Sequence, residues 1–232
     1  MKAVILVSLA LVCLGDIASW APRKPQWPPV FTAAWNEQTS YSGELKYTGG
    51  VAFYDYPNGH LNWTRWDGIA DPVCNSSVPL PYDTQCAHMV ADGHHYLYTP
   101  ILGQCCMCCS DENGCGVPPP TTMQKLAFLG QGQFLGQKVY NWQNTVNGYD
   151  VTYVETALYN PVNRKWVALF SHYDNYTNVW SFNKKAQSSS FQLPSQCVGA
   201  DMCGGICTYL RDHKPGQLRA TRESLYRGLP LF

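Results

Sequence analysis

The spacing of the cysteines constrains this chain more than any other sequence feature. Five of the 11 cysteines lie within the segment GQCCMCCSDENGCG at positions 103–116. Cys13 lies in an apolar N-terminal run, and the ten others are Cys74, Cys86, Cys105, Cys106, Cys108, Cys109, Cys115, Cys197, Cys203 and Cys207. An even number of cysteines in an exported chain favours disulfide bonds, although their pairing cannot be derived from the sequence.

The N-terminus indicates export. Lys2 precedes an apolar run that is too short to span a bilayer comfortably, so residues 1–19 are predicted to be a signal peptide. No later run is long and apolar enough to predict a transmembrane segment. Three N-x-[ST] sequons, at Asn62, Asn75 and Asn175, predict N-glycosylation. We therefore expect a secreted glycoprotein, with the lysosome as the alternative location.

The cysteine-rich segment allows three interpretations. Thiolates at this density could bind zinc or copper, and Cys105 and Cys108 have the spacing of a redox pair. A structural zinc site usually has a second pair of cysteines a dozen or more residues away, and a redox pair usually begins a helix; neither pattern is present. Adjacent cysteines on extended backbone point in different directions. We therefore favour a loop stapled by disulfides to separate elements, with no metal and no cofactor.

Short alternating runs separated by turn residues predict a mainly β protein. Asn58-Gly59 and Asp92-Gly93 indicate hairpin turns, and a third hairpin is expected across residues 160–163. Further strands are expected on both sides of the glycines in 126–143 and over 178–187, with one short turn of helix in 201–213. The domain prediction is a Pro-rich leader at 20–30, one β domain at 31–197, and a Cys-containing C-terminal extension and tail at 198–232.

Composition narrows the function classes. The net charge is zero and no basic patch is present, so nucleic acid is not an expected partner. Aromatic residues make up 13% of the chain and charged residues only 14%. Most of these aromatic side chains are expected to fill a core, and some to line a concave apolar cavity. Arg65 lies in a predicted strand, where a carboxylate partner would come from Asp55 or Glu155.

No catalytic residue is predicted. The chain has neither a G-x-S-x-G nor an H-E-x-x-H motif, and His94 and His95 should face opposite sides of one strand. A secreted hydrolase that uses His88, His94 or His95 is kept as one alternative function. An extracellular structural or adhesive glycoprotein without a ligand pocket is another. No D-x-D-x-D-G calcium loop occurs.

Several segments together resemble the ependymin-related secreted glycoproteins. They are VAFYDYPNGHLNWTRWDG, HHYLYTP, the cysteine run, LAFLGQGQFLGQKVYNWQ, YDVTYVETALYNPVNRKWVALF and LPSQC, within about residues 31–197. The resemblance implies a curved antiparallel sheet like that of LolA-type lipoprotein carriers, a half-barrel around a hydrophobic pocket. It also implies a homodimer, calcium association, a lipid or other hydrophobic ligand, and no enzymatic activity.

The resemblance also assigns positions. It places Cys86, one cysteine between Cys105 and Cys109, and Cys197 among the disulfide positions of the family. It places Trp142, Tyr153 and Phe170 on pocket-side strands. With the remaining aromatic candidates, the predicted ligand pocket comprises Trp35, Phe53, Trp63, Trp142, Tyr153 and Phe170. The leading prediction is therefore a secreted protein that binds a hydrophobic small molecule or lipid in the concave face of its sheet.

Overall fold

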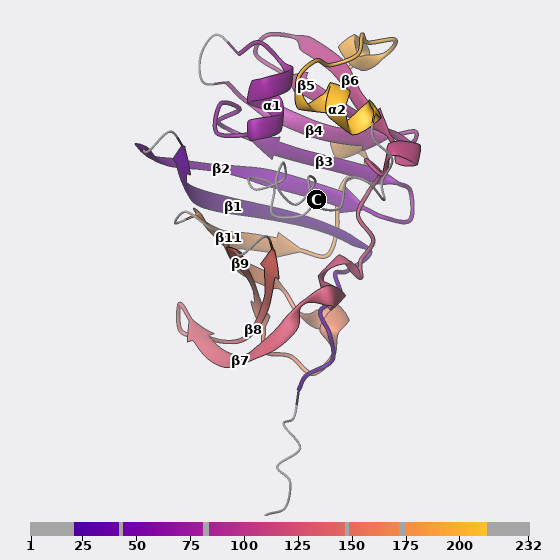
Figure 1. Ribbon diagram of the computed structural model, residues 1–232. Helices are drawn as coiled ribbons and strands as arrows, with labels where there is room; N and C mark the ends of the chain where they lie inside the picture. Colours follow the sequence, from indigo (N-terminus) through magenta and orange to yellow (C-terminus); the bar gives the residue numbers. More distant parts are fainter. Residues whose placement is uncertain (1–20, 42–43, 81–83, 147–148, 172–174, 213–232) are drawn as a thin grey trace, which may run out of the picture.

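The fold is one antiparallel sheet of eleven strands that does not close into a barrel (Figure 1). The computed structural model describes residues 21–41, 44–80, 84–146, 149–171 and 175–212; the predicted signal peptide and the tail from residue 213 lie outside them. The mainly β prediction is confirmed.

The strands are β1 (Val30–Tyr41), β2 (Glu44–Asp55), β3 (His60–Arg65), β4 (Cys86–Ala91), β5 (His94–Thr99), β6 (Gln104–Ser110), β7 (Ala127–Phe134), β8 (Gln137–Val146), β9 (Tyr149–Thr156), β10 (Trp166–Ser171) and β11 (Asn175–Asn183). The α-helices are α1 (Pro72–Ser77) and α2 (Ile206–Asp212), and the 3₁₀ turns are η1 (Asp111–Asn113), η2 (Thr122–Lys125), η3 (Pro161–Asn163), η4 (Ser188–Phe191) and η5 (Ser195–Cys197).

The sheet consists of two meanders joined in the middle. Strands β1 to β6 pair in sequence order, and so do β7 to β11. The two meanders meet where β1 pairs with β11, with Thr32 opposite Asn183. Among the described residues, the first strand and the last strand therefore form the centre of the sheet, and β6 and β7 form its edges.

The predicted hairpins are present, but one turn differs from expectation. Asp92 (φ 51°) and Gly93 (φ 71°) form a two-residue turn between β4 and β5, as the sequence indicated. At the first hairpin, Asp55 pairs with His60, so the loop has four residues, 56–59. Within that loop only Gly59 (φ 67°) has a positive φ, so it is not the two-residue turn that Asn58-Gly59 predicted.

The cysteine run is a strand rather than a loop, which corrects the sequence interpretation. It forms edge strand β6 and pairs with β5, where Cys106 lies opposite Leu97. The bridges are Cys105–Cys197, Cys106–Cys203, Cys108–Cys207, Cys109–Cys115 and Cys74–Cys86. Neighbouring cysteines do have different partners, as expected. Three of the bridges tie β6 to residues 197–207, and two of them, through Cys203 and Cys207, fasten the predicted C-terminal extension to the edge strand.

The sheet is strongly curved. Strands β3 and β10 are four positions apart and would lie roughly 19 Å apart in a flat sheet. The rings of Trp63 on β3 and Trp166 on β10 nevertheless lie with their centroids 5.9 Å apart. Gly50 makes this packing feasible, because a Cβ atom there would lie 2.5 Å from the Trp35 ring. These tryptophans therefore mark the concave face.

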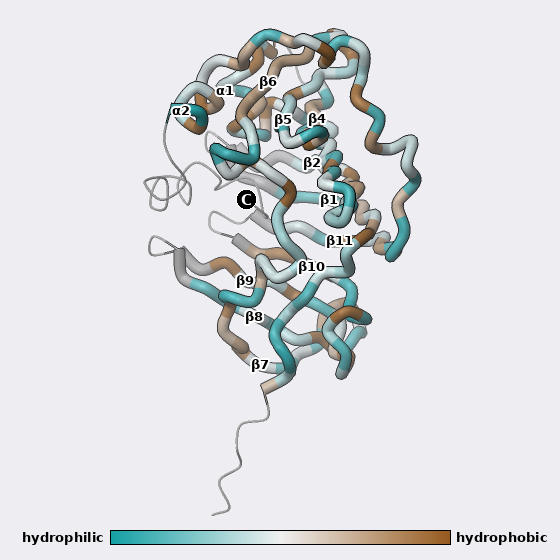
Figure 2. The backbone as a smooth tube through the Cα atoms, turned by 90° about the vertical axis from the view of Figure 1, so that its right-hand side faces the viewer, coloured by the Kyte–Doolittle hydropathy of each residue, from teal (hydrophilic) through white to brown (hydrophobic). Residues whose placement is uncertain are grey.

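The concave face carries the main core. Its aromatic members are Trp27, Phe31, Trp35, Tyr54, Trp63, Tyr140, Trp142, Tyr153 and Trp166. Burial alternates along β3 and β5, as expected when the two faces of a sheet differ in burial, whereas all six residues of β4 are buried. Hydrophobic and hydrophilic segments are interspersed along the backbone of both halves (Figure 2). At the β4–β6 end, α1 and α2 lie over the sheet (Figure 1) and pack against Cys86 and Leu97 in a second, cysteine-rich core.

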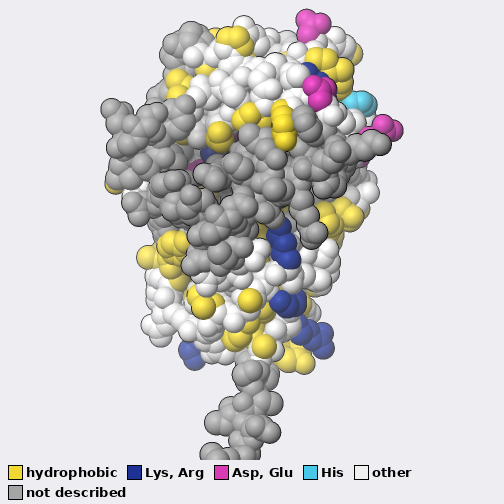
Figure 3. Space-filling view, viewed as in Figure 1, with side chains coloured by type: hydrophobic (Ala, Val, Ile, Leu, Met, Phe, Trp, Pro, Cys, Tyr) yellow, Lys and Arg dark blue, Asp and Glu magenta, His cyan; other side chains and the backbone are white. Residues whose placement is uncertain are grey.

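Charged side chains on the visible surface separate toward the two ends of the molecule. In the view of Figure 3, most of the Lys and Arg side chains lie over the β7–β11 half, and the Asp and Glu side chains lie mainly toward the β4–β6 end. Hydrophobic side chains are scattered between them on both halves. On this face the two halves therefore differ in charge, although the chain as a whole has a net charge of zero.

Candidate functional site

A chain of buried polar side chains crosses the concave face between β1 and β5. Strand register places its members there: His88 lies directly opposite Trp63, and His95 lies opposite Val90. Residues that are opposite each other in an antiparallel pair share one face of the sheet. This polar chain of side chains therefore begins beside the aromatic core and extends toward the cysteine-rich end of the sheet.

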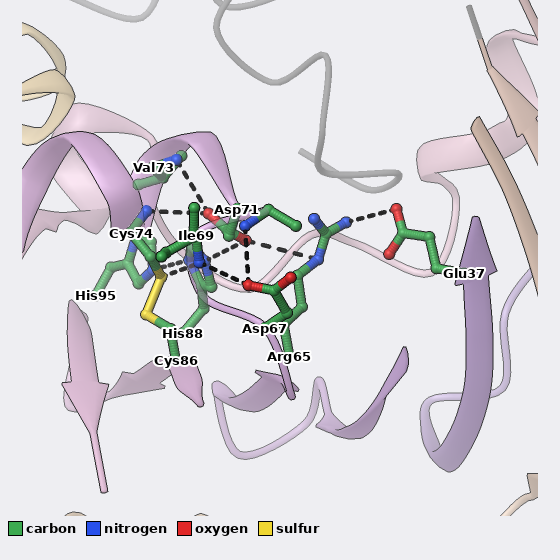
Figure 4. A network of polar contacts seen from close by, with 11 residues as sticks. Glu37, Arg65, Asp67, Ile69, Asp71, Val73, Cys74, Cys86, His88 and His95 are labelled. Atoms are coloured by element: carbon green, nitrogen blue, oxygen red, sulfur yellow. Dashed lines mark hydrogen bonds and ion pairs between the residues drawn. A yellow bond between two sulfur atoms is a disulfide. The ribbon is translucent and has the colours of Figure 1, made fainter. Parts of the chain in front are cut away.

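Arg65 is the first link. Its Nη2 lies 3.2 Å from Oε1 of Glu37 and its Nε 3.6 Å from Oδ2 of Asp71, and all three side chains are buried (Figure 4). The partners expected from the sequence, Asp55 and Glu155, were wrong. Asp55 accepts a hydrogen bond from Asn58 in the first hairpin loop, and Glu155 pairs with Arg164 at 2.6 Å.

Asp71 connects Arg65 to two histidines. It is the N-cap of α1, where its Oδ1 accepts from the backbone N–H groups of Val73 and Cys74. Its other oxygen lies 3.1 Å from Nε2 of His88, and Nδ1 of His88 lies 3.0 Å from Nε2 of His95 (Figure 4). The Pro72 that follows Asp71 suits the first helical turn, because proline has no N–H to leave unpaired there.

Both histidines lie next to disulfide sulfurs. Sγ of Cys74 is 3.5 Å from Nε2 of His88, and Sγ of Cys109 is 3.8 Å from Nδ1 of His95. His94, the neighbour of His95, points the other way and contacts the carbonyl of Asp92. The expectation that His94 and His95 face opposite sides is confirmed.

Burial and neighbouring charges set the protonation of this chain. Burial alone would raise the pKa of Asp71, but His88, Arg65 and the backbone N–H of Cys74 hold it well below its usual range. Burial, and then His88, lower the pKa of His95 to about 3, so its imidazole is neutral at physiological pH. Burial raises the pKa of Glu37, against the opposing effect of Arg65.

A cavity of about 750 Å³ adjoins the far end of the polar chain. His95, Val90 and Cys115 contribute to its wall, so it lies on the concave side of β4 and β5. Its lining residues are Tyr56, Pro57, Gly59, Val90, His95, Asp111, Gly114, Cys115, Gly116, Val117, Pro118, Pro119 and Thr122. Most of them are apolar or glycine, and the ionisable side chains among them are Tyr56, His95 and Asp111.

The predicted pocket residues separate into two groups. Trp35, Trp63, Trp142 and Tyr153 are fully buried together in the aromatic core of the concave face. Phe53 and Phe170 are not part of that core: Phe53 contacts Phe191, and Phe170 is 38% exposed and contacts Phe134. None of the six lines the 750 Å³ cavity.

Two of the predicted glycosylation sites have described side chains. Asn62 is half-buried on β3, and its Nδ2 donates a hydrogen bond to the carbonyl of Ser190. Asn75 is half-buried in α1. Asn175 begins β11, and its side chain lies outside the described part.

Sequence reasoning missed Glu37 and Asp71, and it did not connect His88 with His95. Two sequence signals could have found part of this site. Asp71-Pro72 has the pattern of an N-cap followed by a first-turn proline. A two-residue turn at Asp92-Gly93 fixes the register of β4 on β5, which places His88 and His95 on one face at diagonal positions.

The comparisons with known proteins show no family and only distant structural similarities. No family model matches the chain, and no curated protein matches it. An uncharacterized conserved protein from Thermus thermophilus aligns with a TM-score of 0.46 at 6% identity, over 73% of this chain and 88% of that one. PNGF-II aligns with a TM-score of 0.40 at 13% identity, over 78% of this chain but only 32% of that one.

A third solved structure is a domain described as a putative outer membrane lipoprotein-sorting protein domain from Vibrio parahaemolyticus. It aligns with a TM-score of 0.36 at 11% identity, over 70% of this chain and 89% of that one. At these low values none of the three similarities carries an argument about function. Within the described residues, no helix is long and apolar enough to cross a membrane.

The buried His95 gives a testable pH dependence. Its folded-state pKa of about 3 lies below the ordinary value of 6.5, so the unfolded chain binds more protons between these two values. The contribution to stability is complete above about pH 6.5 and is lost as the pH falls toward 3, with a slope of up to about 1.4 kcal/mol per pH unit. Urea unfolding at a series of pH values should show a shallower slope for His95→Gln than for the wild type.

His94→Gln is the matched control, since His94 is the sequence neighbour and lies outside the buried chain. It should leave the slope unchanged. Equal slopes for the wild type and His95→Gln would show that His95 does not titrate with a lowered pKa.

Proposed function

We propose that this protein is a secreted, N-glycosylated binding protein that takes up a hydrophobic or amphipathic small molecule, such as a lipid, on the concave side of its sheet. The observation that supports the proposal most is the cavity of about 750 Å³ beside β4 and β5. Ligand pockets typically measure about 300–1,000 Å³ and are mainly apolar with a few polar groups. The cavity agrees with this description in both size and lining.

The lining indicates which ligands fit. Val90, Val117 and the prolines 118 and 119 offer apolar surface, and the neutral imidazole of His95 offers one polar contact. The positive charge of Arg65 is already matched by Glu37 and Asp71 within the fold. A long apolar chain with a small polar group therefore suits the cavity better than a multiply charged ligand.

The disulfides support the proposed location. Ten cysteines form five bridges, which persist in oxidising compartments and are rare in reducing ones. Homodimer formation and calcium association remain predictions from the ependymin resemblance.

A binding role fits the histidines better than hydrolysis. Hydrolysis through a nucleophile would need a hydroxyl or thiol within hydrogen-bond reach of a histidine. Among the described residues, the recorded partners of His88 and His95 are each other, Asp71 and disulfide sulfurs. We therefore propose no catalytic role for these residues.

Titration with cis-parinaric acid, a fluorescent fatty acid, tests the proposal. Val117 lines the cavity and is partly buried against the aromatic core, so Val117→Trp should narrow the cavity. We expect the purified wild type to bind the probe saturably, and Val117→Trp to weaken binding about 10-fold or more, which is about 1.4 kcal/mol. Native mass spectrometry of protein from its natural source should show a co-purifying apolar compound.

Val198→Trp is the matched control, because Val198 is 75% exposed and lies away from the cavity lining. It should bind the probe like the wild type. An absence of saturable binding by the wild type would reject the proposed function. Equal binding by both tryptophan variants would place the ligand elsewhere on the protein.

A further inference from the structure

The Cys109–Cys115 disulfide lies next to His95 at the wall of the cavity. A ring nitrogen of His95 and the sulfurs of Cys109 and Cys115 all lie within 4.8 Å of one another, and Nδ1 of His95 is 3.8 Å from Sγ of Cys109. All three side chains are buried, and both His95 and Cys115 line the cavity. We propose that reduction of the Cys109–Cys115 bridge converts this cluster into a binding site for a soft or borderline metal ion such as Zn²⁺ or Cu⁺.

The separation of the ligand atoms fits such an ion. With the usual Zn–S and Zn–N bond lengths, a nitrogen and a sulfur on one tetrahedral zinc lie about 3.6 Å apart. Nδ1 of His95 and Sγ of Cys109 are 3.8 Å apart already in the bridged protein. After reduction, the two sulfurs need only separate by side-chain rotation for both to reach the ion.

A hydrogen bond with His88, which is itself bonded to Asp71, orients the imidazole ring of His95 for metal binding. When Nδ1 binds a metal, the ring proton is on Nε2, which then donates to Nδ1 of His88 at 3.0 Å. His88 in turn donates from Nε2 to the carboxylate of Asp71 at 3.1 Å. Outer partners of this kind fix the tautomer and orientation of a metal-binding histidine.

The cavity provides space for a further metal ligand and a route by which the ion could enter. Three protein ligands leave one coordination position open, as in zinc sites that bind water or a substrate. Because His95 and Cys115 line the cavity, that position would face it, and a small reductant or ion could enter the same way. A second cluster, Asp71, Cys74 and His88, is less suitable, because Nε2 of His88 is already bonded to Asp71 and none of its three residues lines this cavity.

Reduction of the Cys109–Cys115 bridge is an ordinary thiol–disulfide exchange. A dithiol reductant transfers two electrons and two protons to the bridge, which gives the thiols of Cys109 and Cys115 and leaves the reductant as its own disulfide. Metal binding then releases the two thiol protons to solvent. The proposal is independent of the ligand-binding function, because it depends only on the three side chains and their support.

The test uses limited reduction of the protein with dithiothreitol, removal of the reductant without oxygen, and then addition of Co²⁺, a spectroscopic substitute for zinc. We expect alkylation mapping to find Cys109 and Cys115 reduced, and one Co²⁺ per chain to bind with a thiolate-to-cobalt charge-transfer absorption. His95→Gln should weaken Co²⁺ binding by more than the about 10–100-fold that loss of an outer partner costs. His94→Gln, the neighbouring histidine, should bind like the wild type.

Two further variants keep the test decisive. Cys109→Ala/Cys115→Ala should abolish the absorption, while Cys105→Ala/Cys197→Ala removes a different bridge and should retain it. Circular dichroism checks that each variant is folded. The proposal is overturned if the wild type, with free thiols at Cys109 and Cys115, takes up no Co²⁺, or if His95→Gln binds it as tightly as His94→Gln does.

Discussion

Alanine replacement of both Cys108 and Cys207 is expected to lower the free energy of unfolding by about 2–3 kcal/mol, whereas removal of all three bridges between β6 and residues 197–207 should cost about 10 kcal/mol. The three bridges span 92, 97 and 99 residues in sequence, yet they run nearly in parallel. If at least one of the three bridges remains, removal of another bridge frees a loop of only about ten residues in the unfolded chain. Loss of the last bridge releases a loop of nearly 100 residues, which costs about 4–5 kcal/mol.

Guanidinium unfolding of the single, double and triple bridge variants would measure this series. A natural domain is stable by about 5–15 kcal/mol, so the triple variant should be largely unfolded by circular dichroism without denaturant. The Cys109–Cys115 bridge is the control, because it closes a separate short loop and its removal should add the same cost in every background. Costs of about 4–5 kcal/mol for each single removal would show that the three bridges act independently.

The parts of the fold that local sequence patterns specify were predicted well. Asp92-Gly93 fixed a hairpin because both turn positions need a positive φ, which glycine and aspartate tolerate better than most residues. The hairpin expected at Asn58-Gly59 is also present, with β3 as its second strand, although its loop has four residues. Adjacent cysteines were expected to have different partners because successive strand side chains face opposite sides, and the bridges agree.

The features that were missed depend on distant contacts. Pairing of β1 with β11 joins segments almost 150 residues apart, and no local pattern specifies it. The cysteine run was interpreted as a stapled loop, but pairing with β5 makes it a strand. A buried Arg65 needs a carboxylate partner. The local sequence could not indicate that the partners are Glu37, two strands away, and Asp71, at the N-cap of α1.

The second large effect is expected at Asp71. Asp71→Ala should lower the free energy of unfolding by about 3–5 kcal/mol, because it leaves the buried Arg65 without one of its two carboxylates. The same change removes the partner of His88 and the cap of α1, and a cap is worth about 1 kcal/mol. Urea unfolding with the disulfides intact measures the difference.

Two variants separate the contributions of charge and cap. Asp71→Asn retains a side-chain oxygen for the helix cap but loses the charge, so it should fall between the wild type and Asp71→Ala. Asp67→Ala is the matched control: Oδ1 of Asp67 accepts from the backbone of Ile69 and Ala70, and its loss should cost only about 1 kcal/mol. If Asp71→Ala costs no more than Asp67→Ala, the polar chain from Glu37 to His95 contributes little to the free energy of unfolding.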